Sequence, residues 1–204
     1  MKIAVQQVGE LMTNCYIVWD ENTKNAAVID PGDDGAWLAD LLKKEGLTLR
    51  YILLTHGHYD HIGGVPELRE ACGGAPEIYL SEKDLGLRPV FGEQVYLDPK
   101  WITFWKEGDT VTMDSVTFRV LETPGHTPGS VCLLCGDVLF SGDTLFQGSC
   151  GRTDFPGGSW KEMEASLRRL YELPGDYAVL SGHTGSTTLE RERKTNMFMR
   201  SAIS

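Results

Sequence analysis

The chain has 204 residues, of which 41% are hydrophobic and 24% are charged. This is an ordinary globular composition with enough length to bury a core, which excludes a collagen, a coiled coil and a wholly disordered chain. Asp and Glu number 29 against 19 Lys and Arg, a formal charge of −10, so we expect neither nucleic acid nor an anionic membrane as a partner.

The sequence also bears on the compartment. No apolar run approaches the ~20 residues of a membrane helix, and the N-terminus lacks the apolar stretch of a signal peptide. The five cysteines are odd in number and scattered, so we interpret them as reduced thiols of a cytoplasmic protein. Cys132 and Cys135 have C-x-x-C spacing on a predicted strand, where residues i and i+3 face opposite sides, and this argues against a metal or redox pair.

Hydrophobic periodicity alternates between two residues, typical of strands, and 3.6 residues, typical of helices. Strands are predicted at residues 2–8, 14–20, 25–30, 50–55, 77–80, 109–113, 115–122, 130–135, 137–141 and 177–181. Helices are predicted at residues 34–45 and 65–71, as a helical turn at 81–87, after Ser159, and from Thr187 to about Met199. A meander followed by alternating strands and helices predicts a single domain over residues 1–204, built as mixed sheets covered by helices.

Several helix boundaries carry explicit signals. Asp34 is expected to cap the helix at 34–45, and Gly46 to end it. The apolar stripe of that helix is predicted as Trp37, Leu38, Leu41 and Leu42. Capping boxes are predicted for Ser159 with Glu162 and for Thr187 with Glu190. Residues 88–107, rich in proline and aromatic side chains, are expected to form a lid or loop packed by its aromatics.

The densest chemical signal is Thr-His-Gly-His-Tyr-Asp-His at residues 55–61, directly after a predicted strand. Imidazole and carboxylate ligands together suit zinc and other borderline divalent metals. The spacing is too tight for one tetrahedral shell, but His56 and His58 can face one metal while Asp60 and His61 face a second. A structural zinc site would instead be expected to use cysteines.

Three later strands end at a glycine that is followed by a metal-capable side chain: His126, Asp143 and His183. Mixed α/β folds commonly place their sites at the carboxyl ends of strands, so we expect these residues to join the first cluster. The candidate ligands are His56, His58, Asp60, His61, His126, Asp143 and His183, which include every histidine of the chain. Asp143 could instead be a turn residue. Asp30 is either an Asx-turn residue before Pro31 or a carboxylate that orients a ligand histidine.

Six motifs carry a resemblance to a known family. They are the segment at 55–61, Thr-Pro-Gly-His-Thr-Pro-Gly-Ser at 123–130, Ser-Gly-Asp-Thr at 141–144, Gly-Arg-Thr-Asp-Phe-Pro-Gly-Gly at 151–158, Ser-Gly-His at 181–183 and Thr-Leu-Glu-Arg-Glu-Arg-Lys-Thr-Asn at 188–196. With them the chain resembles the metallo-β-lactamase superfamily, and within it the short bacterial glyoxalase II-like hydrolases. The resemblance implies an α/β protein with the αββα sandwich, in which two mixed sheets have helices outside and metals at one edge.

The resemblance also implies a ligand set. His56, His58 and His126 would hold a first metal, Asp60, His61 and His183 a second, and Asp143 would bridge the two. Zn²⁺ is the expected metal, with iron or manganese as alternatives. A bridging Asp143 argues against a true β-lactamase, and His58 argues against the flavodiiron relatives, which usually carry Glu there.

The features that bind glutathione in longer glyoxalase II enzymes are only partly present in this sequence. Longer glyoxalase II enzymes carry a C-terminal helical domain that supplies much of the glutathione site, and we expect that domain to be absent because few residues follow His183. Arg152 lies where those enzymes place a basic residue near glutathione, whereas their tyrosine two residues later is Asp154 here.

We therefore expect a hydrolase that cleaves thioesters of the S-lactoylglutathione type by a metal-bridging hydroxide, with Asp60 and Asp143 as the catalytic carboxylates. One alternative is a persulfide dioxygenase with a single iron held by His56, His126 and Asp143. A phosphodiesterase or nuclease of the same superfamily is another, and a non-catalytic metal-binding protein a third. Metal content distinguishes the hydrolase from the dioxygenase, since two zinc ions favour the hydrolase and one iron favours the dioxygenase.

Overall fold

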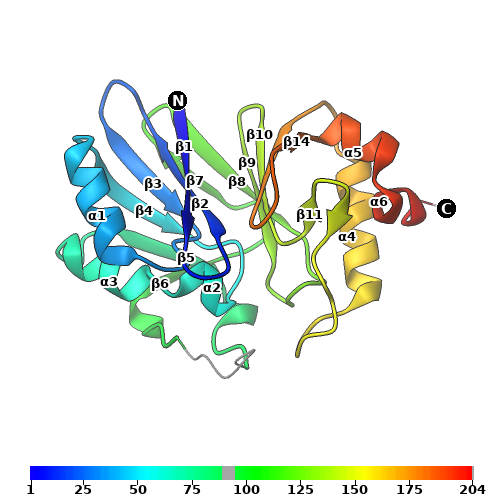
Figure 1. The fold of residues 1–204 in the computed structure, drawn as a ribbon, viewed down its shortest axis with the longest axis horizontal. Helices are drawn as coiled ribbons and strands as arrows, with labels where there is room; N and C mark the ends of the chain where they lie inside the picture. The colour runs from blue at the N-terminus through cyan, green and yellow to red at the C-terminus, as the bar shows by residue number, and fades with distance from the viewer. Residues whose placement is uncertain (89–94, 204) are drawn as a thin grey trace.

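Two six-stranded sheets face each other in a computed structural model that describes residues 1–88 and 95–203 (Figure 1). The first sheet has the order β1-β2-β3-β4-β5-β6, with its antiparallel pairs at β1–β2 and β2–β3 and parallel pairs beyond. Its strands are β1 (Lys2–Val8), β2 (Thr13–Trp19), β3 (Asn25–Ile29), β4 (Thr48–Leu53), β5 (Glu77–Ser81) and β6 (Ile102–Trp105).

The second sheet has the order β14-β13-β10-β9-β8-β7 and is antiparallel except for the parallel pair β10–β13. Its strands are β7 (Thr110–Met113), β8 (Val116–Glu122), β9 (Val131–Cys135), β10 (Val138–Gly142), β13 (Ala178–Ser181) and β14 (Thr187–Thr188). A small hairpin of β11 (Leu145–Phe146) and β12 (Ser149–Cys150) follows β10. Both sheets are therefore mixed, as expected.

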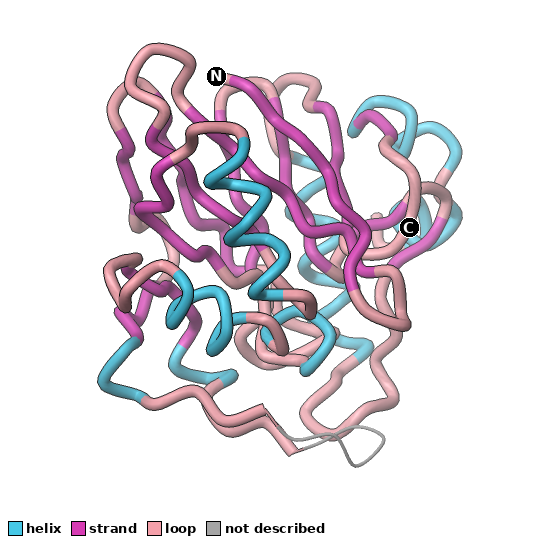
Figure 2. Tube along the Cα trace, turned by 60° about the vertical axis from the view of Figure 1, so that its left-hand side comes forward, coloured by secondary structure: helices cyan, strands magenta, loops and turns pink. Residues whose placement is uncertain are grey.

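Helices cover the outer faces of both sheets (Figures 1 and 2). On the side of the first sheet lie α1 (Gly35–Lys44), α2 (Tyr59–Ile62) and α3 (Val65–Ala71), with short 3₁₀ turns at Glu82–Asp84 and Pro99–Trp101. On the side of the second sheet lie α4 (Trp160–Glu172), α5 (Leu189–Thr195) and α6 (Met197–Ser201). This is the αββα sandwich, and the predicted fold class is confirmed. No helix in the described parts of the chain is long and apolar enough to cross a membrane.

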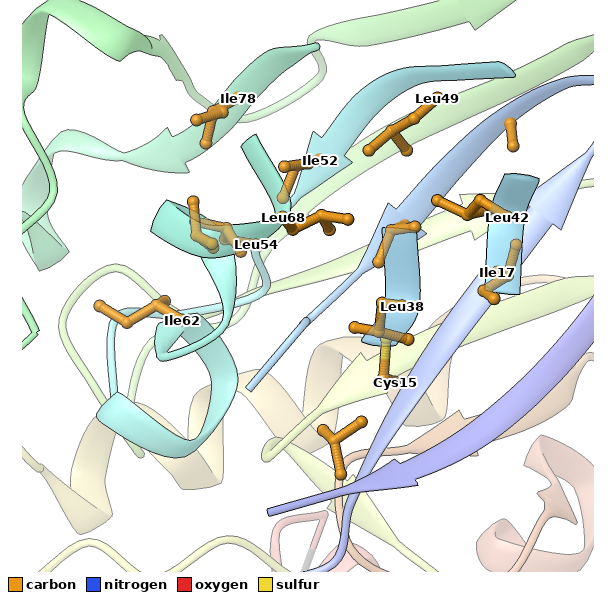
Figure 3. Packing of buried hydrophobic residues seen from close by; sticks show 14 of the residues in the cluster. Cys15, Ile17, Leu38, Leu42, Leu49, Ile52, Leu54, Ile62, Leu68 and Ile78 are labelled. Carbon is orange, nitrogen blue, oxygen red and sulfur yellow. The ribbon is translucent and has the colours of Figure 1, made fainter. Parts of the chain in front are cut away.

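Three apolar clusters fill the layers. Leu38, Leu42, Ile52 and Leu68 belong to the cluster beneath α1 and α3 (Figure 3). Phe118, Leu133 and Phe140 pack between the sheets, and Leu139 packs with Met163, Leu167 and Leu170 of α4. Cys132 lies in the cluster beneath α4 and Cys135 in the one between the sheets, so the two cysteines face opposite sides of β9 as predicted.

Helix starts were predicted with mixed success. Ser159 accepts a hydrogen bond from the backbone N–H of Glu162, which confirms that cap. Asp34 does precede α1, but its backbone is left-handed and its side chain does not cap the helix; its carboxylate accepts from Gly9 N instead. Trp37, placed on the buried stripe of α1, is 48% exposed, because that stripe centres on Leu38 and Leu42.

The C-terminal helix is also corrected. Its cap is Thr188, which accepts from Arg191 N, whereas the Thr187 hydroxyl donates to the buried Glu192 carboxylate. Asn196 then ends α5 and caps α6 with its own side chain, so one predicted helix is two.

The predicted lid or loop at 88–107 is wrong in part. Residues 102–105 form β6, an edge strand that pairs in parallel with β5. The Pro-rich, aromatic composition hid this strand, which is short and has Trp105 as its buried residue. The segment 89–94 lies outside the described residues.

Candidate metal centre

The seven predicted ligands lie in segments that follow four strands. His56 and His58 follow β4, with Asp60 and His61 on α2 just beyond; His126 follows β8, Asp143 follows β10 and His183 follows β13. The structure brings all seven side chains together. Their places at the carboxyl ends of strands are those expected from the sequence.

Within this set the side chains form two groups that meet at one carboxylate. Ligand-type atoms of His56, His58 and His126 lie within 4.8 Å of one another, and so do those of Asp60, His61 and His183; a third such set, His56, His61 and Asp143, overlaps both. In the first group His58 Nδ1 is 2.8 Å from His126 Nε2. In the second, His183 Nε2 is 3.0 Å from Asp60 Oδ2.

Asp143 lies between the two groups. Its Oδ1 is 3.5 Å from His61 Nε2, and its Oδ2 is 3.5 Å from both His126 Nε2 and His183 Nε2. A side chain in this place can contact ions held by either group. The ligand assignments themselves remain predictions.

Unpaired buried atoms test whether a metal fits this arrangement. His56 Nε2, His58 Nε2 and Asp143 Oδ1 are buried without a hydrogen-bond partner. A buried polar atom without a partner is costly, and such atoms in a native site call for an explanation. Nitrogen and carboxylate donors in this number suit zinc, iron or manganese. The residues therefore fit divalent metals.

Asp30 contacts the cluster from behind. Its carboxylate accepts from Thr55 N at 2.8 Å, from the Thr55 hydroxyl at 2.6 Å and from His61 Nδ1 at 2.9 Å. Gly32 N donates to the main-chain carbonyl of Asp30, so the local turn uses the backbone and leaves the side chain to His61. Of the two interpretations of Asp30, the geometry fits the carboxylate that orients a histidine.

Two further histidines, His56 and His126, also have a hydrogen-bond partner at Nδ1. His56 Nδ1 lies 3.1 Å from the Thr55 hydroxyl, and His126 Nδ1 donates to the Arg152 carbonyl at 2.7 Å. Such contacts fix the ring orientation and leave the opposite nitrogen for the centre.

Three contacting residues were not found from the sequence. The Thr13 hydroxyl donates to Asp60 Oδ2 at 3.2 Å, and Asn14 Nδ2 donates to the carbonyls of Ser181 and Thr184, on either side of His183. Asp84 accepts hydrogen bonds from the segments that carry His58 and His126. The signal for Thr13 and Asn14 was two polar residues opening an otherwise apolar strand; Asp84 had no sequence signal.

A glycine explains how one ligand comes so near the others. A Cβ on Gly182 would lie 2.2 Å from Asp143 Oδ1 and 2.7 Å from a ring carbon of His61. Glycine at the end of β13 therefore lets the backbone before His183 approach the centre. This is a physical reason for the pattern of a strand, a glycine and a ligand noted in the sequence.

Charge is distributed unevenly over the two groups. Burial and the neighbouring His126 and His61 lower the pKa of His58 to about 4, so its ring is neutral. Burial opposes the charged form of His61, but the carboxylates of Asp143, Asp60 and Asp30 outweigh it and raise its pKa to about 10. The raised pKa favours the protonated ring of His61, so a metal at the second group would compete with a proton.

A pocket of about 450 Å³ opens onto the cluster. Leu11, Phe146 and Phe155 give it apolar walls, and Arg152 lies at its lining. The Arg152 guanidinium makes two contacts of 2.7 Å with Asp154 and stacks 4.0 Å from the centre of the Phe155 ring. Arg152 is thus at the pocket, as predicted, but its charge already has a partner.

Sequence similarity to known proteins covers nearly the whole chain. A model of the metallo-β-lactamase superfamily matches residues 8–183. Hydroxyacylglutathione hydrolase GloC of Haemophilus influenzae is 37% identical, over 98% of this chain and 99% of the relative. A hydroxyacylglutathione hydrolase of Gloeobacter violaceus is 41% identical over 88% of this chain, which corresponds to 67% of that relative.

Solved structures agree. The BLEG-1 B3 metallo-β-lactamase has a TM-score of 0.88 at 35% identity, covering 97% of this chain and 99% of its own. TTHA1623 in a di-iron-bound form has a TM-score of 0.79 at 37% identity, covering 96% and 99%. ETHE1 from Myxococcus xanthus has a TM-score of 0.79 at 30% identity, covering 97% and 84%. Together with the His and Asp side chains that could hold divalent metals, these similarities show that the chain belongs to the metallo-β-lactamase superfamily.

Proposed function

We propose that the protein is a two-metal hydrolase of small thioesters, with His56, His58 and His126 holding one metal, Asp60, His61 and His183 the other, and Asp143 bridging them. The observation that carries this proposal is the position of Asp143, 3.5 Å from nitrogens of both groups, below an apolar pocket. The similarity to hydroxyacylglutathione hydrolases at 37% and 41% identity supports a thioester as the substrate class.

Two divalent metals, when bound, supply Lewis acidity and a nucleophilic water at neutral pH. The chain's own residues prepare the site for that chemistry. Asp60 and Asp143 offset the metal charge, and Asp30 holds the His61 ring in one orientation. Leu11, Phe146 and Phe155 cover the apolar part of a substrate and exclude bulk water from the scissile carbonyl.

A nucleophilic side chain is not needed and is not supported. Cys150 is the thiol that lines the pocket, and burial raises its pKa to about 11, so it stays protonated at neutral pH. All five histidines belong to the cluster, which leaves none to activate a serine or cysteine.

The second candidate is the single-iron dioxygenase. The similarity to ETHE1 at 30% identity motivates it, and His56, His126 and Asp143 lie together as its iron site would require. The complete second group of Asp60, His61 and His183 favours two metals over one. The similarity to a B3 metallo-β-lactamase at 35% identity makes β-lactams a necessary part of any substrate test, although a bridging Asp143 argues against that activity.

Metal analysis followed by a substrate panel tests the proposal. Protein purified without added metal should contain close to two metal ions per chain and should hydrolyse S-lactoylglutathione or simpler thioesters. Chelation should abolish this activity, and zinc, iron or manganese should restore it. One iron per chain with oxygen uptake on a persulfide would establish the second candidate instead. Turnover of nitrocefin or of bis-(p-nitrophenyl) phosphate in preference to thioesters would overturn the substrate class.

A further inference from the structure

Asp84 is a buried carboxylate next to the metal centre that has no place in the ligand set. It ends the 3₁₀ turn at Glu82–Asp84 after β5 and is 2% exposed. Its Oδ2 accepts from Gly57 N at 2.9 Å and from the Thr127 hydroxyl at 2.6 Å, and its Oδ1 accepts from Gly129 N at 2.6 Å. Both oxygens of the carboxylate are therefore hydrogen-bonded.

These three donors come from two different loops. Gly57 lies between His56 and His58, whereas Thr127 and Gly129 follow His126. His58 and His126 are 68 residues apart in the chain, yet their ring nitrogens lie 2.8 Å from each other. The Asp84 carboxylate accepts hydrogen bonds from both segments and so links them directly beside those nitrogens.

The fit around Asp84 is close. A Cβ on Gly57 would lie 2.7 Å from the Asp84 carbonyl oxygen, and a Cβ on Gly129 would lie 2.6 Å from Asp84 Oδ1. Glycine at both positions lets the two loops approach Asp84 closely enough for their N–H groups to reach the carboxylate.

We propose that Asp84 is a positioning residue for the first metal, which sets the distance between the His58 and His126 loops without touching the metal. A carboxylate suits this task because it can accept on both oxygens, whereas the amide of asparagine would turn an NH₂ group toward one of the donors. Residues that orient metal ligands typically affect metal affinity by 10–100-fold. The inference rests on the proposed metal centre but not on the identity of the substrate.

Asp20 provides a matched control. It is 3% exposed and accepts from the backbone N–H groups of Asn22, Thr23 and Ser115 and from the Ser115 hydroxyl. It directly follows β2, whose other end, at Thr13, faces the metal centre. Seven strand residues at ~3.3 Å each place Asp20 about 20 Å from that end. Asp20→Asn therefore removes a similar hydrogen-bond set far from the metals.

The test follows zinc binding at each histidine by side-chain NMR, which is feasible because the chain has five histidines. In Asp84→Asn, the signals of His58 and His126 should need at least about tenfold more free zinc than in the wild type, with a much smaller change at His183. Asp20→Asn should lower the melting temperature similarly and leave all five zinc responses at wild-type values. An unchanged response of His58 and His126 in Asp84→Asn, or the same shift in Asp20→Asn, would overturn the proposal.

Thr127→Val provides a second test of the same proposal if Asp84→Asn does not fold. It removes one of the three donors and keeps the two backbone N–H bonds, so a shift of about threefold in the same direction is expected at His58 and His126. No shift would again contradict a positioning role. If zinc changes none of the histidine signals of the wild-type protein, the metal centre itself is refuted. This outcome is distinct from a failure of the Asp84 proposal alone.

Discussion

The two halves of the metal centre are held by different parts of the fold. His56, His58 and His126 are at most 6% exposed, and their loops are tied together through Asp84. In the second group the side chains of His183 and Asp60 are 25% and 13% exposed. β2 of the first sheet supports that group: Thr13 donates to Asp60, and Asn14 donates to the carbonyls of Ser181 and Thr184 beside His183.

If the two proposed metals bind, this difference predicts that the first would be the better enclosed and the second the more open to solvent. Exposure matters because water competes for ligands and screens charge at a partly open site. We therefore expect the second metal to be lost first during chelation. Stepwise removal, followed at His126 and His183 by NMR, checks this order.

Asp143→Ala should give the largest loss of metal binding and activity, and it should weaken metal binding in both halves of the centre. Its carboxylate lies between both groups, so its loss weakens both metals and removes activity. Metal content by mass analysis should fall at both positions. Clean loss of a single metal would show Asp143 to be a ligand of one group.

His58→Ala and His183→Ala should separate the halves. The first variant should lose the first metal and all hydrolysis, and the second should lose mainly the second metal. Both should keep the fold, since the ligands lie on loops outside the apolar clusters. Far-UV circular dichroism and metal content check this, and near wild-type thioesterase activity in His58→Ala would contradict the site.

Asn14→Ala should affect the second half alone and by less. The change removes the Asn14 donor from the Thr184 carbonyl and one of two donors from the Ser181 carbonyl, which keeps the Tyr16 hydroxyl, at a cost of about 1–3 kcal/mol in the free energy of unfolding. The second metal should bind about tenfold more weakly, with the first unchanged. Asn25→Ala is the control, because the Asn25 amide donates to the exposed Asp114 in a bond outside the metal centre. Equal zinc affinities in the two variants would contradict the link between β2 and the second metal.

Arg152→Ala should give the smallest effect, because the change lies at the pocket rim and leaves both halves intact. We expect less than about a tenfold rise in KM for an anionic thioester and little change in kcat, the pattern of lost uniform binding. Pairing with Asp154 already offsets the guanidinium charge. Asp154→Asn should therefore lower KM for the same substrate. A large fall in kcat for Arg152→Ala would instead place it in the chemical step.

Much of this protein was determined by sequence patterns that act locally. Apolar periodicity gave most strands of both sheets and the helices α1, α3 and α4, because burial of one face requires that period. The candidate ligands also followed from the sequence, since they lie either just beyond an apolar strand or, like Asp60 and His61, in the dense motif that follows one. Local patterns failed where a position is exposed or short, as at Trp37, at β6 and at the break between α5 and α6.

Only the tertiary structure decided which side chains support the ligands. Asp84, Thr13 and Asn14 act on segments far away in the chain, and no spacing rule connects residues that meet through a fold. The sequence is compatible with Asp30 either as an Asx-turn residue or as a carboxylate that orients a ligand histidine, and the 2.9 Å contact between Asp30 Oδ2 and His61 Nδ1 fits the second. The strands determine where a ligand emerges, whereas hydrogen bonds between distant segments determine how closely two ligands approach, because that distance depends on the packing of both sheets at once.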